Sequence, residues 1–193
     1  ETPTQMFRQL VKEITLLLTY EATKDLAVEE VEIQTPLESL TVPRISGKKV
    51  AICPILRAGV GMLDGVLDLI TAARVGFIGL YRDEATLQPV QYYSKVPADL
   101  DERVTIALDP MLATGNSSAA AVTLLKAAGA TDIRFLCLLA APEGVARMKE
   151  AHPDARKEWC KAAQRQDDRA VLLAVGRDIL RQYEDDPAYI RLL

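Results

Sequence analysis

An acidic residue at the end of an apolar stretch, followed by a loop of small residues and hydroxyls, is the strongest chemical signal in this sequence. Asp109 follows residues 104–108, which have the composition of a buried strand, and the loop after it carries Thr114 and Gly115 before a helical pattern begins. The free N–H groups and the positive dipole end of a helix start attract anions. The loop therefore predicts a site for a phosphate monoester, in which Asp109 accepts hydrogen bonds from ribose hydroxyls.

The same loop has a plainer interpretation. In a strand–turn–helix unit without a ligand, Ser117 or Ser118 would serve only as the N-cap of the helix. One hydroxyl suffices to accept a hydrogen bond from an unpaired N–H group of the first turn. The residues of the loop alone leave both interpretations open.

Two arginines follow other predicted strands. Arg57 comes after residues 50–56, a short and mostly apolar run, and lies two residues before Gly59, while Arg82 ends the next apolar run. An arginine is suited to hold a second anion, such as a diphosphate. Because the carboxyl ends of parallel strands meet at one edge of a sheet, we expect both arginines to join the Asp109 loop in one sugar-phosphate site.

Gly59, Gly61 and Asp64 form an incomplete dinucleotide-binding fingerprint, with Asp83 about 20 residues further on. The fingerprint needs a third glycine for close packing of helix and strand, and Asp64 stands in its place. A dinucleotide-dependent oxidoreductase is therefore a distant alternative.

Histidine and cysteine offer little for catalysis or metal binding. His152, the only histidine, lies in an Ala-His-Pro sequence that predicts a surface turn, where it is a poor candidate for a general base. Cys53, Cys137 and Cys160 are isolated, with no CxxC pair, which argues against a zinc site and a disulfide framework. The sequence therefore predicts free thiols in a reducing, cytoplasmic compartment and no metal site built from side chains.

The elements that must position these residues alternate along the chain. Hydrophobic periodicity predicts helices at residues 4–25, 60–70, 117–128 and 143–150, and strands at 30–33, 50–56, 74–80, 104–108 and 133–140. Apolar strands separated by helices indicate an α/β fold, a parallel sheet with helices on both faces. Residues 89–97, aromatic and bounded by prolines, are predicted to form a hairpin or mobile flap. The predicted apolar face of the first helix consists of Met6, Leu10, Ile14, Leu17, Leu18 and Ala22.

Composition excludes several classes of protein. The chain has 193 residues, 49% of them apolar and 26% charged, with a net charge of −4, which suits one domain with an appendage. The weak negative charge argues against a nucleic-acid partner bound through a basic surface. No apolar run approaches the ~18 residues of a membrane-spanning helix, so we expect no membrane partner and no secretory signal.

The last 40 residues differ in composition from the rest. Residues 154–193 contain 16 charged side chains, whereas the 153 residues before them contain 34. We therefore predict an α/β domain at residues 1–153 and a charged helical segment at residues 154–193. An apolar stripe of that segment must pack on the core or on a second subunit, and it consists of Leu172, Val175, Ile179 and Tyr183.

Five segments, taken together and in order, resemble the uracil phosphoribosyltransferase family: residues 52–59, 80–84, 89–97, 108–117 and 139–144. The resemblance implies a phosphoribosyltransferase-type α/β fold, here with a helical C-terminal appendage. It implies transfer of ribose 5-phosphate from phosphoribosyl diphosphate to uracil, giving uridine monophosphate and diphosphate. It also implies Mg²⁺ carried by the diphosphate, GTP binding, and a cytoplasmic homodimer or higher homo-oligomer.

The same resemblance assigns roles to individual residues. It implies that Asp109 and Arg57 are the catalytic residues, and that Arg57 and Arg82 bind the diphosphate portion of the substrate. The residues that it implies for the ribose 5-phosphate portion are Asp109, Pro110, Met111, Leu112, Ala113, Thr114, Gly115, Asn116 and Ser117.

The sequence departs from the family pattern in two places. Asn116 stands where the family's loop has a second glycine, and Gly176 is the only glycine in residues 155–193, where the family has a glycine-rich run that clamps the base. The second departure predicts weak or absent turnover of uracil. It also keeps a non-catalytic module that binds phosphoribosyl diphosphate, or a regulatory module, as an alternative to an active enzyme.

Overall fold

The computed structural model describes residues 3–47, 50–83 and 88–154. Its central sheet consists of β3 (Val50–Leu56), β4 (Arg74–Val75), β5 (Phe77–Arg82), β6 (Pro89–Lys95), β7 (Val104–Leu108) and β9 (Asp132–Leu136). The strand order is β6-β5-β3-β7-β9, with β4 beside β3. Every pairing in this sheet is parallel except that of β6 with β5. The predicted parallel sheet is confirmed, with one antiparallel strand at its edge.

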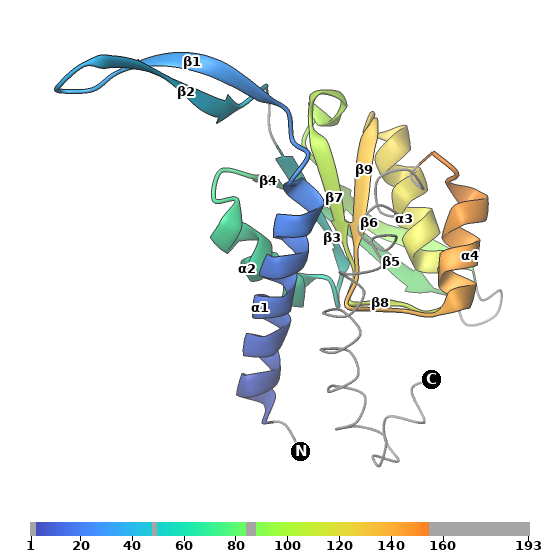
Figure 1. The fold of residues 1–193 in the computed structure, drawn as a ribbon. Coiled ribbons are helices and arrows are strands. Elements are labelled where there is room, and N and C mark those ends of the chain that lie inside the picture. Colours follow the sequence, from blue (N-terminus) through green and yellow to red (C-terminus); the bar gives the residue numbers. More distant parts are fainter. Residues whose placement is uncertain (1–2, 48–49, 84–87, 155–193) are drawn as a thin grey trace.

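Helices cover both faces of the sheet, as the sequence predicted (Figure 1). On one face lie α1 (Thr4–Thr23) and α2 (Val60–Leu69). On the other lie α3 (Asn116–Ala127) and, beside it, α4 (Pro142–Ala151). Alternate side chains of β3 enter two separate cores, because Ile52 packs in the core that contains α2 whereas Cys53 packs in the core that contains α3. A short 3-10 helix, η1 (Leu100–Glu102), precedes β7.

The buried face of α1 agrees only in part with the predicted one, whose Leu18 and Ala22 pack against the core. The buried residues are Val11, Thr15 and Thr19, whereas Met6 and Leu17 are exposed. The hydroxyls of Thr15 and Thr19 each donate a hydrogen bond of 2.7 Å to the backbone carbonyl four residues earlier, so their burial leaves no polar group unpaired. Gly65 of α2 brings the two helices close at this face, since a Cβ atom there would lie 2.4 Å from the carbonyl oxygen of Lys12 and 2.9 Å from Cβ of Thr15.

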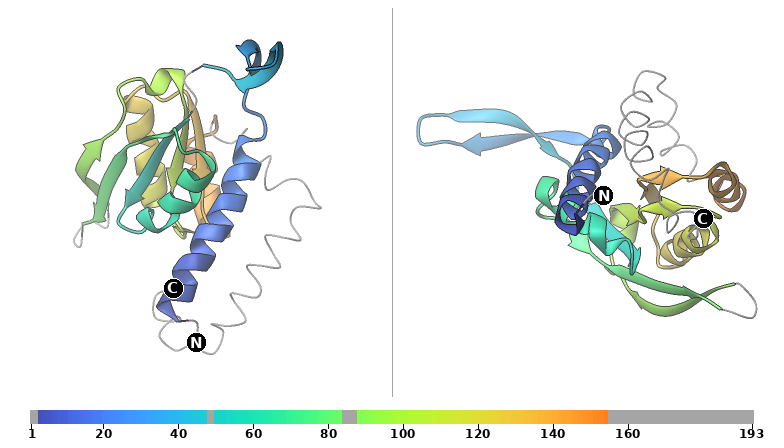
Figure 2. Two further views of the ribbon diagram at one scale, coloured as in Figure 1. Left: turned by 90° about the vertical axis from the view of Figure 1, so that its left-hand side faces the viewer. Right: turned by 90° about the horizontal axis from the view of Figure 1, so that it is seen from below.

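A two-stranded arm follows α1. β1 (Val28–Gln34) pairs antiparallel with β2 (Ser39–Ile45), and Figure 2 shows the arm projecting from the core. The sequence predicted only the first strand, ended by Pro36. Pro43 concealed the second strand, but a strand at the edge of a sheet tolerates the missing N–H of proline.

Two other predicted strands are each divided. Residues 74–80 contain all of β4 and the beginning of β5, which are separated at Gly76. Residues 133–140 contain most of β9 and then β10 (Leu139–Ala140), which leaves the central sheet and pairs in parallel with β8 (Met111–Leu112). Residues 89–97, predicted as a hairpin or mobile flap, supply one strand, β6, which pairs antiparallel with β5.

The predicted C-terminal segment, residues 154–193, lies outside the described residues except for Asp154, and so does its stripe of Leu172, Val175, Ile179 and Tyr183. Within the described part of the chain, no helix has both the length and the apolar character needed to cross a membrane.

Candidate active site

The loop that begins at Asp109 is held by backbone hydrogen bonds to the end of β9 and to the segment that follows it. The N–H of Asp109 donates to the carbonyl of Leu136 at 3.2 Å, and the carbonyl of Pro110 accepts from the N–H of Leu138 at 3.0 Å. Further along, the carbonyl of Leu112 accepts from the N–H of Ala141 at 2.8 Å. These contacts explain why the predicted strand at residues 133–140 is divided, because its second half is paired with the loop.

Two glycines bring α4 against this loop. Gly115 has a φ of +77°, a left-handed conformation that favours glycine. A Cβ atom on Gly115 would lie 2.8 Å from the carbonyl oxygen of Gly144, and a Cβ on Gly144 would lie 2.4 Å from the carbonyl oxygen of Ala113. The backbone of the first turn of α4 therefore packs directly against the backbone of the loop and limits its movement.

Among the described residues, no side chain caps the first turn of α3. The N-cap residue is Gly115, and it makes no side-chain capping hydrogen bond. The interpretation of Ser117 or Ser118 as a mere N-cap is therefore wrong. The first hydrogen bond of the helix runs from the N–H of Ala119 to the carbonyl of Gly115 at 2.8 Å. The N–H groups of the residues before Ala119 therefore have no carbonyl partner within α3. Thr114 and Ser117 are exposed beside them, as a phosphate site requires.

Asp109 has an electrostatic environment unlike that of a surface carboxylate. Burial raises its pKa to about 6, and the N–H of Met111, which donates to Oδ1 at 3.3 Å, opposes this rise. The carboxylate is ionised above that pH and can then accept hydrogen bonds from hydroxyl donors. It also adds to burial in raising the pKa of the Cys137 thiol to about 12. Burial likewise raises the pKa of the Cys53 thiol to about 12, so neither described cysteine is a nucleophile at neutral pH.

The turn that carries Arg57 packs closely against the end of β7. A Cβ atom on Gly59 would lie 2.2 Å from the carbonyl oxygen of Leu108, so only a glycine lets this turn come so close to the residue before Asp109. The peptide bond between Leu56 and Arg57 is cis. The structure thus places Arg57 beside the Asp109 loop, as the sequence predicted, whereas Arg82 lies further out, at the exposed end of β5.

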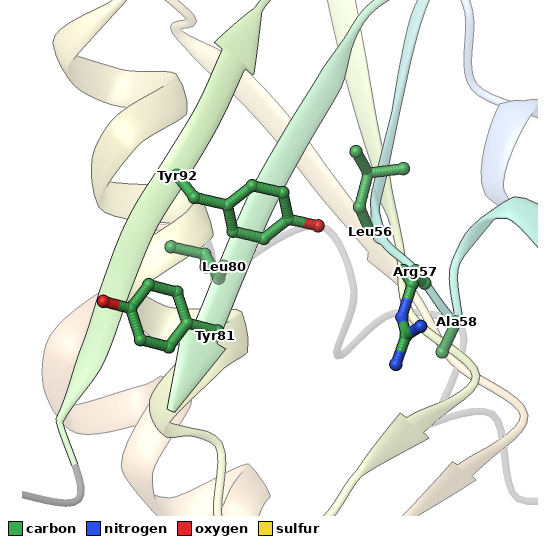
Figure 3. Close-up of a pocket in the computed structure, with 6 residues that line it drawn as sticks. All are labelled: Leu56, Arg57, Ala58, Leu80, Tyr81 and Tyr92. Atoms are coloured by element: carbon green, nitrogen blue, oxygen red, sulfur yellow. The ribbon is translucent and has the colours of Figure 1, made fainter. Parts of the chain in front are cut away.

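A pocket of about 740 Å³ opens next to this turn, and Figure 3 shows the residues that line it. Its walls consist of Leu56, Arg57, Ala58, Leu80, Tyr81 and Tyr92. Its volume falls within the ~300–1,000 Å³ range of small-molecule sites. The sequence analysis missed the two tyrosines, although the aromatic character of residues 89–97 was a signal that could have found Tyr92.

The incomplete dinucleotide fingerprint has no structural counterpart. A Cβ atom on Gly61 would meet nothing within 4 Å, and Asp64 is exposed on α2. The fingerprint needs its third glycine for close packing of the helix on a strand, and exposed position 64 makes no such contact. The glycine at position 59 is explained instead by the close contact of its backbone with the end of β7.

We therefore expect Gly61→Ala to stabilise the protein. The residue is helical and unobstructed, so the lower conformational entropy of alanine in the unfolded chain should raise the free energy of unfolding by about 0.5–1 kcal/mol. Urea denaturation followed by circular dichroism measures this change. A loss of stability would contradict the open environment of Gly61.

His152 is not on a surface turn, contrary to the prediction. It ends α4 with 4% of its surface exposed, and its Nε2 lies 2.8 Å from the carbonyl oxygen of Ala119 and 3.3 Å from the hydroxyl of Thr123. Burial lowers the pKa of this imidazole. The Ala-His-Pro pattern predicts a turn but does not show that the end of α4 packs on α3. There the imidazole of His152 contacts Ala119 and Thr123 of α3.

Across residues 3–47, 50–83 and 88–154, no three His, Cys, Asp or Glu side chains gather into a group that could hold a metal ion.

Comparison with known proteins shows which family this sequence resembles. The sequence matches the family described as uracil phosphoribosyltransferase over residues 1–173. A uracil phosphoribosyltransferase of Paracoccus denitrificans is 65% identical over 153 residues, which are 79% of this chain and 72% of that protein. One of Staphylococcus epidermidis is 60% identical over 153 residues, 79% of this chain and 73% of that protein.

Solved structures agree with this relationship. The AQ2163 protein from Aquifex aeolicus has a TM-score of 0.74 at 34% identity, over 80% of this chain and 74% of that one. A purine phosphoribosyltransferase from Pyrococcus horikoshii has a TM-score of 0.50 at 14% identity, over 74% of this chain and 78% of that one, which shows a shared fold. The predicted phosphoribosyltransferase-type fold is confirmed. The chain belongs to the uracil phosphoribosyltransferase family.

Proposed function

We propose that this chain binds phosphoribosyl diphosphate and transfers its ribose 5-phosphate group to uracil. The observation that carries the proposal is the first turn of α3, which no side chain of the described residues caps and which directly follows a loop that begins at a half-buried carboxylate, Asp109. Thr114 and Ser117 add hydroxyl donors for the 5-phosphate. Arg57, on the adjoining turn, supplies the positive charge for the diphosphate.

The reaction proposed for this site needs little covalent chemistry from the protein. The bond from the anomeric carbon of the ribose to the diphosphate oxygen breaks, a ring nitrogen of uracil bonds to that carbon, and the proton of that nitrogen leaves to solvent. Positive charge builds on the sugar while negative charge builds on the leaving diphosphate. Asp109 holds the ribose in line and favours the positive charge, and Arg57 stabilises the leaving group. These two residues are the proposed catalytic residues.

The proposal has further parts that rest on the resemblance. Mg²⁺ enters with the diphosphate, as part of the substrate. Arg82 approaches the diphosphate from β5, and the rest of the ribose 5-phosphate site is formed by Pro110, Met111, Leu112, Ala113, Gly115 and Asn116. We also propose GTP binding, a cytoplasmic location and assembly into a homodimer or higher homo-oligomer.

The test measures binding of Mg²⁺–phosphoribosyl diphosphate by calorimetry. Arg57→Ala should weaken binding about ten- to hundredfold, because it removes charge-assisted hydrogen bonds to a phosphate. Arg74→Ala is the matched control: Arg74 pairs in register with Ala51, near the beginning of β3, whereas Arg57 follows the end of that strand. If the parent chain does not bind this substrate, or if both variants bind as the parent does, the proposal is wrong.

Uracil turnover is expected to be slow. Residues 155–193 hold no glycine-rich run for clamping the base, and a poorly positioned acceptor costs about a hundredfold in rate. The assay compares uridine monophosphate formation by the intact chain and by the Paracoccus denitrificans relative at saturating phosphoribosyl diphosphate. Equal rates would show that other residues of this chain form the base site.

A further inference from the structure

A β-bulge directs one tyrosine of β6 toward the candidate active site. Gly79 of β5 pairs with Tyr93 and Leu80 pairs with Gln91, so Tyr92 is the extra residue between two regular pairs. Bulges of this kind redirect a side chain, and they are common next to active sites.

Gly79 leaves room for the redirected ring. A Cβ atom at Gly79 would lie 2.6 Å from Cζ and 2.7 Å from Cε2 of Tyr92. The Tyr92 ring therefore lies across β5 in space that any other residue at position 79 would occupy. Its position depends on two features of the backbone, the bulge and the missing side chain.

The hydroxyl of Tyr92 points across the pocket toward the turn that carries Arg57, whereas the hydroxyl of Tyr81 points the other way (Figure 3). Tyr92 is 53% exposed, so solvent or a ligand can reach it. Among the described residues, the structure records no hydrogen bond for this hydroxyl and no ion pair for Arg57. One neutral donor and one cation therefore face the same pocket without a partner in the described chain.

We propose that Tyr92 is a further binding residue of the diphosphate site, whose hydroxyl donates a hydrogen bond to the diphosphate that Arg57 holds. This inference rests on the proposed function and adds Tyr92, on the side of the pocket formed by β6, to the residues of the same site. A tyrosine hydroxyl donates to phosphate oxygens at neutral pH without adding charge. It can therefore hold the diphosphate across the pocket from Arg57.

The test uses Tyr92→Phe, which removes the hydroxyl and keeps the ring. Calorimetry should show about tenfold weaker binding of phosphoribosyl diphosphate and of inorganic diphosphate, both with Mg²⁺, since the lost hydrogen bond goes to a charged group. Ribose 5-phosphate, which lacks the diphosphate, should bind as it does to the parent. Tyr93→Phe is the control, because Tyr93 neighbours Tyr92 but does not line the pocket.

A second variant tests the same position by another route. Gly79→Ala retains the hydroxyl but displaces the ring, so it should weaken diphosphate binding as Tyr92→Phe does. The double variant should lose no more than either single one, because both remove one contact.

The outcomes separate this inference from the proposed function. If the parent binds phosphoribosyl diphosphate and Tyr92→Phe binds it equally well, this inference alone is wrong. If Tyr92→Phe weakens ribose 5-phosphate as much as diphosphate, the hydroxyl does not act on the diphosphate, and the inference is again wrong. If the parent binds neither diphosphate ligand, the proposed function and this inference both fail.

Discussion

Asp109→Asn should weaken binding of Mg²⁺–phosphoribosyl diphosphate at least about a hundredfold at pH 8, and it should stabilise the ligand-free protein at the same pH. The loss of binding follows because the carboxylate is proposed to accept hydrogen bonds from two ribose hydroxyls, and bonds to a charged acceptor contribute about 1.5–3 kcal/mol each. The amide of asparagine has no charge and only one oxygen to offer.

The gain in stability follows from the pKa of Asp109, which burial raises to about 6. An aspartate in the unfolded chain has a pKa of about 3.9. Between these values the folded protein retains a proton that the unfolded chain has released, so stability falls as the pH rises through this window. Above pH ~6 the full cost of the buried charge is present, and Asp109→Asn should raise the free energy of unfolding by roughly 1–3 kcal/mol.

Denaturant titrations at pH 8 and pH 4 measure this effect, with calorimetry for the ligand. The gain should disappear at pH 4, where little of the Asp109 carboxyl is charged in the folded parent. An equal gain at both pH values would assign the stabilisation to something other than the charge. Binding by the parent should weaken as the pH falls below 6, and binding by the variant should lack this Asp109 component.

Gly144→Ala is expected to damage both the fold and the phosphate site. The new Cβ would lie 2.4 Å from the carbonyl oxygen of Ala113 and 2.7 Å from that of Leu112. Both are backbone atoms of the Asp109 loop, so either α4 or the loop must move. We expect a loss of about 1–3 kcal/mol in the free energy of unfolding, typical of overpacking, although alanine favours a helix more than glycine does.

The same variant should bind phosphoribosyl diphosphate at least about tenfold more weakly, because the displaced loop carries the N–H groups that we propose bind the 5-phosphate. Gly61→Ala is the matched control, since it makes the same chemical change on a helix where the Cβ meets nothing within 4 Å. Unfolding by urea and calorimetry together measure both effects. If Gly144→Ala behaves like Gly61→Ala, α4 does not support the loop.

The sequence by itself determined the four helices and their alternation with the strands of the parallel sheet, the helices on both faces of the sheet, and the position of the Asp109 loop and Arg57 at the ends of β7 and β3. These features depend on residues close together in the chain. The period of apolar residues defines an element, and the chemistry of the loop lies within nine consecutive positions, 109–117. Local spacing therefore sufficed for them.

The tertiary structure alone decided which surfaces meet. Thr15 and Thr19 are buried, and Met6 and Leu17 are exposed, because α2 packs closely against the threonine side of α1. His152 is buried because α4 ends against α3, and Pro43 is tolerated because its strand lies in a two-stranded arm.

The same reason holds for the site. That Gly115 and Gly144 pack backbone to backbone, and that Tyr92 faces Arg57 across a pocket, both depend on segments distant in sequence. Side-chain type and spacing describe one segment at a time, whereas each of these contacts is a property of two backbones and of the distance between them.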